Sequence, residues 1–441
     1  MKNAALQTRQ ALARAAALYA LPLYEMARMQ SASSPRRNAS GQWAGPAGAP
    51  DSTLRWVNRF SHTRHLLGPA DRRVVTPNND TLYTNAWLDL SRGPLLIHTP
   101  DTGSRYYVLG FLDFYTNPFA YSGTRTTGTA AQTLFVHGPG WSGLVPAGTI
   151  EVASPTDHVW VLGRILAAPE EALEPVHALQ DAFRIARAAQ PDAGYDGEVI
   201  DAGIGPRDVI GDPVLFLKVV NRALALNPPP ADQAALLAGF GSVGIGANLP
   251  VDGAPHGLAE ALGEVLEELA APQASALGGG WTLPVDVRSN FGTNWHQRAL
   301  VARNYIGALG IEEAMYLMAD VDSGGALLDG RRRYRLHFAH DAQPAVDGFW
   351  SLTMYRKSDC LLVDNPAGRY SIGDRTPGLK YDAGGGLTIV IGHAPPAEPA
   401  NWLPAPAEPF YLSLRLYLPR TTHIERSFTY PPIVPEPEKH P

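Results

Sequence analysis

The sequence predicts a mainly β protein with additional helices: an N-terminal helix, two antiparallel β domains and a helical segment that joins them. Its 441 residues exceed what one hydrophobic core normally supports, which favours two or three domains. Two blocks of short β-type runs are separated by Gly, Pro, Asp and Asn, as in antiparallel sandwiches. Because a stretch of helical periodicity lies between these blocks, we predict domains at residues 1–30, 50–168, 169–310 and 311–441.

The first thirty residues carry apolar side chains at near-helical spacing, among them Ala13, Leu21 and Tyr24. This spacing predicts an amphipathic helix. The polar stretch that follows, from Ser31 to Ser52, contains several prolines and predicts a loop or linker.

The apolar run from Ala15 to Tyr24 has the length of a signal-peptide core, but other residues argue against export. Pro22 interrupts the run, and Glu25 and Arg28 charge the stretch where a cleavage region should be small and neutral. No later run reaches the length of a membrane span. We therefore expect a soluble, cytoplasmic protein with no membrane partner.

The predicted strands and helices follow from the period of the apolar residues. The strands of the N-terminal block are Leu95–His98, Tyr106–Phe111 and Leu134–His137. Helical periodicity covers 169 to about 190, Val214–Leu226 and Leu258–Ala271. The strands of the C-terminal block are Arg333–Phe338, Phe349–Tyr355, Leu387–Gly392 and Phe410–Tyr417.

Charge and cysteine content exclude several classes of protein. The net charge is -6, and Lys and Arg are scattered, so we expect no nucleic-acid partner. The single cysteine, Cys360, excludes an intrachain disulfide framework and a Cys-based zinc cluster. We interpret Cys360 as a buried hydrophobic residue rather than a reactive thiol.

The common catalytic motifs are absent or out of context. Gly239, Gly241 and Gly244 have dinucleotide spacing but follow a helical stretch where a strand is required, and neither a P-loop nor a Gly-x-Ser-x-Gly elbow occurs. The histidine pairs 62/65 and 337/340 lack the glutamate and spacing of a zinc helix. We predict no cofactor, although ligands from distant strands could still converge on a divalent metal.

Two polar segments beside predicted strands are the candidate site in the N-terminal block. The first contains Asn78, Asn79, Asp80 and Tyr83 behind a proline, and the second contains Asp113, Tyr115 and Asn117 directly after an apolar strand. Asn and Asp commonly bond their own backbone in turns, so each segment is either a structural turn or a ligand site at the rim of a sandwich.

These segments also carry a family resemblance. Pro77–Tyr83, Arg105–Tyr107, Asp113–Asn117 and Gly123–Arg125 resemble the domain of unknown function numbered twelve fifty-four. Phe349–Tyr355, Asn365–Pro366, Arg369–Asp374 and Asn401–Pro406 resemble the companion domain numbered twelve fourteen. The resemblance covers most of the chain from Tyr19 to Pro432. It implies two jelly-roll-like β-sandwich domains with helical additions, similar to peptide N-glycanase, and a homo-oligomer; it implies no catalytic residues.

The companion domain supplies a second polar set. Arg369, Tyr370, Asp374 and Asn401 are framed by Trp350 and Trp402. A guanidinium beside aromatic faces could clamp a carboxylate or a sugar. An Arg-Tyr pair can equally brace a loop through backbone carbonyls, and tryptophans in sandwiches are mostly core residues.

Three functions are compatible with these residues. A hydrolase of an amide, ester or glycosidic bond would place Asp80 and Asp113 in one interdomain cleft, with Tyr83, Tyr115 or Arg369 polarising the substrate. A non-catalytic protein would bind a carbohydrate or small molecule there, and a structural module would oligomerise through Ala11–Met29. The candidate catalytic residues are Asp80, Asp113 and Tyr115. The candidate substrate-binding residues are Asn78, Asn79, Tyr83, Arg105, Asn117, Arg369, Tyr370 and Trp402.

Overall fold

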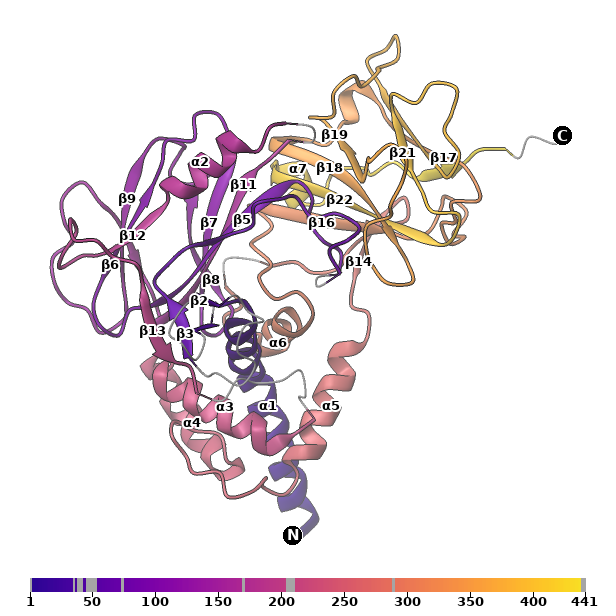
Figure 1. Ribbon diagram of the computed structural model, residues 1–441. Helices are drawn as coiled ribbons and strands as arrows, with labels where there is room; N and C mark the ends of the chain where they lie inside the picture. Colours follow the sequence, from indigo (N-terminus) through magenta and orange to yellow (C-terminus); the bar gives the residue numbers. More distant parts are fainter. Residues whose placement is uncertain are drawn as a thin grey trace.

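The computed structural model describes residues 2–34, 36–37, 43–44, 54–72, 75–168, 171–203, 211–287 and 290–437. Two β domains lie side by side above a group of helices, with the N-terminal helix α1 (Lys2–Ser33) among them (Figure 1). The prediction of a mainly β protein with two sandwiches, a helical segment and an N-terminal helix is confirmed. Most of the predicted linker lies outside the described residues, and its first residues, Ser31–Ser33, belong to α1.

The N-terminal β domain is a sandwich of two sheets with strand orders β10-β9-β6-β12 and β4-β5-β11-β7-β8. Its strands are β4 (Ser61–His62), β5 (Thr81–Asp89), β6 (Leu95–Thr99), β7 (Tyr107–Asp113), β8 (Pro118–Gly123), β9 (Gln132–His137), β10 (Ile150–Ala153), β11 (His158–Leu166) and β12 (Arg184–Arg187). Every residue of β7 is buried, because the core of the sandwich covers one face of its sheet, and helices together with the C-terminal domain cover the other.

The C-terminal β domain is a second sandwich, with strand orders β14-β15-β16-β22-β18-β19 and β21-β20-β17-β23. Its strands are β14 (Ser275–Gly278), β15 (Trp281–Leu283), β16 (Ala314–Ala319), β17 (Tyr334–Phe338), β18 (Val346–Arg356), β19 (Ser371–Gly373), β20 (Leu387–Gly392), β21 (Trp402–Pro404), β22 (Phe410–Pro419) and β23 (Ile433–Pro435). Leu, Ile and aromatic side chains from both sheets form its core. Among the described strand pairs of both sandwiches, β9/β10 and β20/β21 are parallel and the rest are antiparallel.

Besides α1, the helices are α2 (Glu174–Ala182), α3 (Pro213–Leu226), α4 (Ala234–Phe240), α5 (Leu258–Ala270), α6 (Trp295–Asn304) and α7 (Thr421–Ile424), with 3-10 turns η1 (Ala231–Gln233), η2 (Gly241–Val243) and η3 (His340–Ala342). Helices α3, α4, α5 and α6 pack around α1, whereas α7 contacts β22 of the C-terminal domain. Helix α3 begins at Asp212, whose carboxylate accepts hydrogen bonds from the amides of Val214 and Leu215, while Pro213 fills the first helical position.

Helix α1 is a core element of the chain. Its residues from Ala16 to Met26 are buried against α3, α5, α6 and the outer face of the five-stranded sheet. The hydroxyl of Ser33 accepts a 2.9 Å hydrogen bond from the indole of Trp87 on β5. Most of Ala11–Met29 therefore contacts its own chain, which leaves little of this helix for a second copy. Assembly into a homo-oligomer, by this helix or by another surface, stays a prediction.

The middle of the chain differs from the expected all-helical connection. Helical structure expected over 169 to about 190 is limited to α2, and Arg184–Arg187 then forms β12, which pairs with β6. A further strand, β13 (Glu198–Asp201), pairs with β3 (Leu54–Val57) in a small sheet that also holds β1 (Arg36–Arg37) and β2 (Trp43–Ala44). Sheet partners distant in sequence therefore overrode the local helical period.

The two β domains contact each other through the outer faces of their larger sheets. On β22, Arg415 is buried and faces the N-terminal domain, where it donates hydrogen bonds to the carbonyls of Thr76 and Pro77. Glu313 in turn accepts a 2.8 Å hydrogen bond from Tyr106 and forms an ion pair with Arg125. This interface is therefore polar as well as buried. Among the described residues, no helix is both long and apolar enough to cross a membrane.

Candidate binding site beside the helices

Two pockets flank the loop that follows β7, where the N-terminal sandwich meets the helices. The loop begins at Asp113, whose carboxylate accepts hydrogen bonds from the amides of Tyr115 and Asn117 at 2.8 and 2.9 Å and from the side chain of Asn117 at 2.8 Å. Burial raises the pKa of Asp113, and these three donors oppose the rise. The carboxylate is therefore committed to holding the turn.

The first cavity, here called the Arg298 pocket, has a volume of about 330 Å³. Its lining includes three of the predicted site residues, Asp113, Tyr115 and Asn117, together with Arg298 from α6. Its remaining lining residues are Phe119, Pro155, Thr156, Pro230, Gln233, Asn290 and Gly292. The sequence-predicted segment after β7 thus does border a cavity, although its acid is used by the turn.

Arg298 is the unusual group of this pocket. It is 4% exposed, and its guanidinium lies over the rings of Tyr19 and Tyr115 at 5.0 and 5.6 Å from their centroids. Within the described chain its one hydrogen bond is a long one, 3.4 Å from Nη2 to the carbonyl of Tyr19, and its buried Nε has no partner. Burial lowers the pKa of Arg298, while Tyr19 and Asp113 act in the opposite direction.

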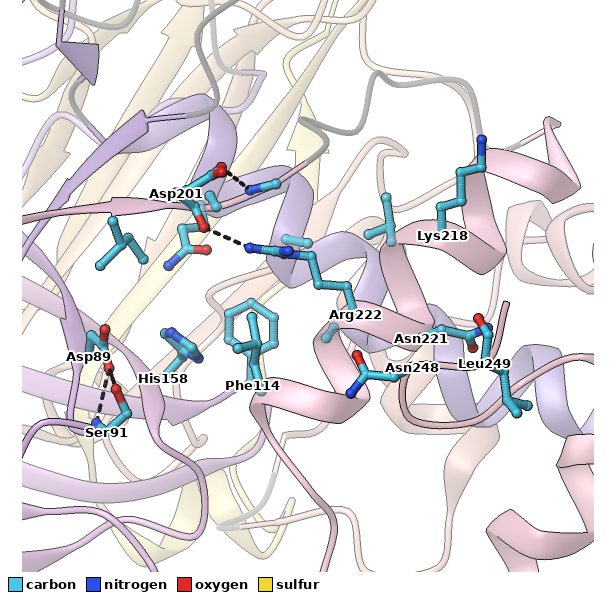
Figure 2. A pocket seen from close by; sticks show the side chains of 18 of the residues that line it. Asp89, Ser91, Phe114, His158, Asp201, Lys218, Asn221, Arg222, Asn248 and Leu249 are labelled. Carbon is cyan, nitrogen blue, oxygen red and sulfur yellow. Dashed lines mark hydrogen bonds between the residues drawn. The ribbon is translucent and has the colours of Figure 1, made fainter. Parts of the chain in front are cut away.

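The second cavity, the α3 pocket, has a volume of about 510 Å³ and lies on the other side of the same loop. Figure 2 shows Asp89, Ser91 and His158 on one wall, Phe114 in the middle, and Lys218 and Arg222 of α3 opposite. Burial lowers the pKa of His158, which favours a neutral ring.

Asn227, directly after α3, connects the two pockets. Its side-chain oxygen lies 2.9 Å from the backbone nitrogen of His158 and 3.2 Å from the ring Nδ1 of the same residue. Its backbone carbonyl accepts a 2.8 Å hydrogen bond from the hydroxyl of Tyr115. One buried residue therefore orients a side chain in each cavity.

The segment Asn78–Asp80 lies elsewhere, against the C-terminal domain. Asn78 donates a 2.7 Å hydrogen bond to the hydroxyl of Tyr417, and Asn79 lies 3.5 Å from the hydroxyl of Ser371. The hydroxyl of Ser351 donates a 2.6 Å hydrogen bond to Asp80. These three predicted site residues thus contact the partner domain.

The structure does not bring Asp80 and Asp113 into one cleft, and that part of the prediction is wrong. Strand β11 pairs with both β5 and β7, with Leu166 opposite Thr81 and Val159 opposite Asp113. The two acids are therefore about eight residues apart along β11, or roughly 26 Å at about 3.3 Å per residue. Such a distance prevents them from acting on one bond.

The other predicted residues of the N-terminal domain are distant from both pockets. Arg105 forms an ion pair with Glu171 and donates a 2.7 Å hydrogen bond to the carbonyl of Leu166. Tyr83 packs against the guanidinium of Arg164 at the interface of the two β domains. Both residues therefore contact protein groups rather than a cavity.

In the C-terminal domain, the geometry matches the structural alternative. Nη1 of Arg369 donates hydrogen bonds to the carbonyls of Pro399, Ala400 and Trp402, at 3.3, 2.9 and 3.0 Å. The indole of Trp402 is buried and donates to the carbonyl of Gly392. Tyr370 packs against a small apolar cluster. This polar set therefore braces a loop and forms no clamp.

Sequence reasoning missed the groups that distinguish the pockets, namely Arg298, Gln233, His158 and Gln30. A weak signal existed for Arg298, a charge that directly precedes the apolar run 299–302 in what proves to be α6. Nothing local marks the others, because their neighbours come from distant parts of the chain. No group of three or more potential metal ligands occurs within the described residues.

Two family models match the sequence. The model described as "Protein of unknown function (DUF1254)" matches residues 57–187, and its counterpart DUF1214 matches residues 313–421. The chain contains both domains. The resemblance found in the sequence motifs is thereby confirmed, with the DUF1254 domain in the N-terminal half and the DUF1214 domain in the C-terminal half. The Arg298 and α3 pockets border the DUF1254 domain.

One solved structure supports the fold across the whole chain. The crystal structure of the VPA0106 protein from Vibrio parahaemolyticus is similar, with a TM-score of 0.75 and 25% identity over 97% of this chain and 100% of that one. An uncharacterized protein from Burkholderia cenocepacia is 13% identical, with a TM-score of 0.43 over 95% of this chain and 86% of that one. No curated protein is similar to the sequence.

Proposed function

We propose that this protein binds a small carboxylate in the Arg298 pocket and acts as a small-molecule binding protein. The observation that carries the proposal is the guanidinium of Arg298, which is buried beside a cavity without an acidic hydrogen-bond partner among the described residues. The predicted residues Tyr115 and Asn117 lie in the same wall.

A buried guanidinium without a counterion is unfavourable because of its desolvation. Burying an unpaired charge costs roughly several kcal/mol, and proteins normally offset this cost with a counterion and hydrogen bonds. Asp113 is near Arg298 but uses its oxygens on the turn donors. A ligand carboxylate would supply the missing acceptors, and the planar fork of arginine matches its two oxygens.

The cavity suits a small ligand in size and polarity. Its volume is near the lower end of the range for ligand pockets, roughly 300–1,000 Å³. Asn117, Thr156 and Asn290 offer polar groups on the wall, while Phe119 and the ring of Tyr115 offer apolar surface. These residues would fix the orientation of a carboxylate that reaches Arg298.

The geometry supports binding better than the alternative functions. A two-carboxylate hydrolase needs its acids at one site, whereas Asp80 and Asp113 lie at opposite ends of β11. Trp350 and Trp402, the aromatic residues considered for a sugar, are both buried. Hydrolysis by other residues stays a hypothesis.

The test uses pairs of ligands that differ only in charge. We would titrate the full chain with benzoate and acetate, and with the neutral benzamide and acetamide, by calorimetry and protein NMR. Charge-assisted hydrogen bonds are worth about 1.5–3 kcal/mol each, so the acids should bind at least about tenfold more tightly than the amides. Equal affinity within a pair would overturn the proposal.

Two variants assign binding to the pocket. Arg298→Gln removes the charge, and Gln233→Glu adds a negative charge while keeping the oxygen that accepts the 2.6 Å hydrogen bond from Tyr19. Both should weaken carboxylate binding about tenfold or more. Lys380→Gln, on the C-terminal domain, is the control and should bind normally. Because Gln233→Glu preserves shape, unchanged binding by a folded Gln233→Glu protein would place the ligand elsewhere.

A further inference from the structure

We infer that the α3 pocket is a second ligand site, which takes a small hydroxylated organic acid. The inference goes beyond the proposed function, because it concerns a separate cavity with different unpaired groups. At about 510 Å³ the pocket falls within the size range of small-molecule sites, roughly 300–1,000 Å³. Its chemistry follows from the inner wall and from the mouth.

On the inner wall, His158 presents a hydrogen-bond acceptor. The side-chain oxygen of Asn227 accepts a hydrogen bond from the backbone amide of His158 and lies 3.2 Å from the ring Nδ1. Because an amide oxygen carries no proton, Nδ1 must be the donor in the second contact. In the neutral ring, Nε2 then holds a lone pair. Nε2 makes no hydrogen bond within the described part of the chain, although His158 is only 6% exposed.

Two further groups that line the pocket are incompletely paired. The side-chain nitrogen of Gln30 on α1 is a buried donor without a partner in the described chain, and Gln30 itself is 5% exposed. One carboxylate oxygen of Asp89 accepts from the amide and hydroxyl of Ser91, while none of the described residues donates to the other. A ligand hydroxyl both donates and accepts, so it can complement the acceptors on His158 and Asp89 or the donor on Gln30.

The mouth of the pocket carries two cationic side chains beside the carboxylate of Asp201. Lys218 and Arg222 are four residues apart on α3, both are exposed, and Figure 2 shows them opposite Asp89 and His158. Arg222 donates a 2.9 Å hydrogen bond to the carbonyl of Asp201, which holds its guanidinium at the rim, and Lys218 makes no ion pair within the described chain. An acid group here would gain charge-assisted contacts at little desolvation cost.

The inner wall and the mouth together determine the class of ligand. A molecule that spans the pocket would point its hydroxyl toward His158 and Asp89 and its acid group toward Lys218 and Arg222. Phe114 lies between the two ends and offers apolar surface to the carbon skeleton. A purely apolar ligand would leave the wall unsatisfied, and a cation would meet Lys218 and Arg222 at the entrance.

The probe pair is malate and succinate, which differ by one hydroxyl. Binding would be followed on the full chain by calorimetry and by ¹⁵N NMR of the histidine rings, with the His158 signals assigned through His158→Gln. We expect malate to shift Nε2 of His158 and to bind at least about tenfold more tightly than succinate, because one well-paired buried hydrogen bond is worth about that factor. Equal binding of the two acids, or malate binding without a shift at His158, would overturn the inference.

A matched pair of variants tests the mouth. Lys218→Gln and Lys380→Gln remove the same charge, the first at the α3 pocket and the second on an exposed loop of the other β domain. Malate affinity should fall about fivefold or more in Lys218→Gln and stay unchanged in Lys380→Gln. Gln233→Glu, which blocks the Arg298 pocket, should leave the malate shift at His158 intact. If Gln233→Glu abolishes that shift, or Lys218→Gln does not weaken binding, malate is not held as inferred.

Discussion

Replacing Asp80 with asparagine tests whether this carboxylate joins the two β domains. Asp80 is 1% exposed, accepts a 2.6 Å hydrogen bond from the hydroxyl of Ser351 and lies 3.6 Å from Nη2 of Arg375. Nε and Nη1 of Arg375 are buried without hydrogen-bond partners in the described chain, and its guanidinium stacks on Phe349 at 3.8 Å. Asp80→Asn keeps the shape but removes the negative charge nearest to this cation.

The magnitude follows from the distances. At an effective dielectric constant of about 20, unit charges this far apart attract by about 5 kcal/mol. Two features reduce the effect of removing this attraction. The carboxylate of Asp374 remains 3.8 Å from Nε of Arg375, and the side chain of Arg375 is 19% exposed. We therefore expect the stability to fall by about half of the attraction. Loss of charge assistance to the Ser351 hydrogen bond adds about 1 kcal/mol. The free energy of unfolding should fall by about 3 kcal/mol.

The assay is urea unfolding followed by tryptophan fluorescence at pH 7.5, because burial raises the pKa of Asp374 to about 6 and this acid must stay charged. A double-mutant cycle with Arg375→Met removes both charges, and the double variant should lose about 1–3 kcal/mol less than the sum of the single variants. If Asp80→Asn leaves stability unchanged or raises it, the charge is held at a cost to the fold, as expected for a functional group, and the anchoring role is refuted.

Three further predictions concern the domains themselves. Arg369→Met should lower the free energy of unfolding by about 1–2 kcal/mol through the lost carbonyl contacts, with benzoate and malate affinities unchanged in calorimetry. Gly163→Ala should cost about 2 kcal/mol or more in urea unfolding, because a Cβ there would lie 2.2 Å from the carbonyl oxygen of Thr84; a neutral result would contradict the pairing of β5 with β11. Burial lowers the pKa of His423 to about 4, below its value in the unfolded chain. The neutral ring therefore stabilises the fold above about pH 6.5, and this contribution is lost as the pH falls toward 4. NMR titration should show no protonation of His423 above about pH 5.

Strands with clear alternation or apolar runs were predictable from the sequence. The segments 95–98, 387–392 and 410–417 lie within β6, β20 and β22, because each has a partner strand that its own pattern also requires. Residues 184–187 were not predictable, since their strand forms only by pairing with β6, nearly ninety residues earlier. Tertiary pairing decides such segments.

The candidate site was predictable in part. The sequence predicted that Asp113 and Asn117 form either a turn at a strand end or part of a ligand site. The structure shows a turn that also borders a cavity. Arg298 comes to this cavity from α6, which lies within the predicted helical region 169–310 but was not predicted as a separate helix. Convergence of residues more than a hundred positions apart leaves no local pattern, so the decisive cation had to come from the structure.

The contacts of Asn78 and Asp80 hold the two β domains of this chain together. These residues belong to the DUF1254 domain, yet their side chains bond to Tyr417 and Ser351 of the DUF1214 domain. Arg415 of the DUF1214 domain is in turn satisfied by carbonyls at the start of the same segment. If the domains were separated, polar groups that are now paired across the interface would lose their partners. Each such group that stayed buried would lower the stability by about 1–3 kcal/mol. The shared motif at Asn78–Asp80 is therefore best understood as a joint between the domains, and ligand chemistry should be sought at the helical side of the DUF1254 domain.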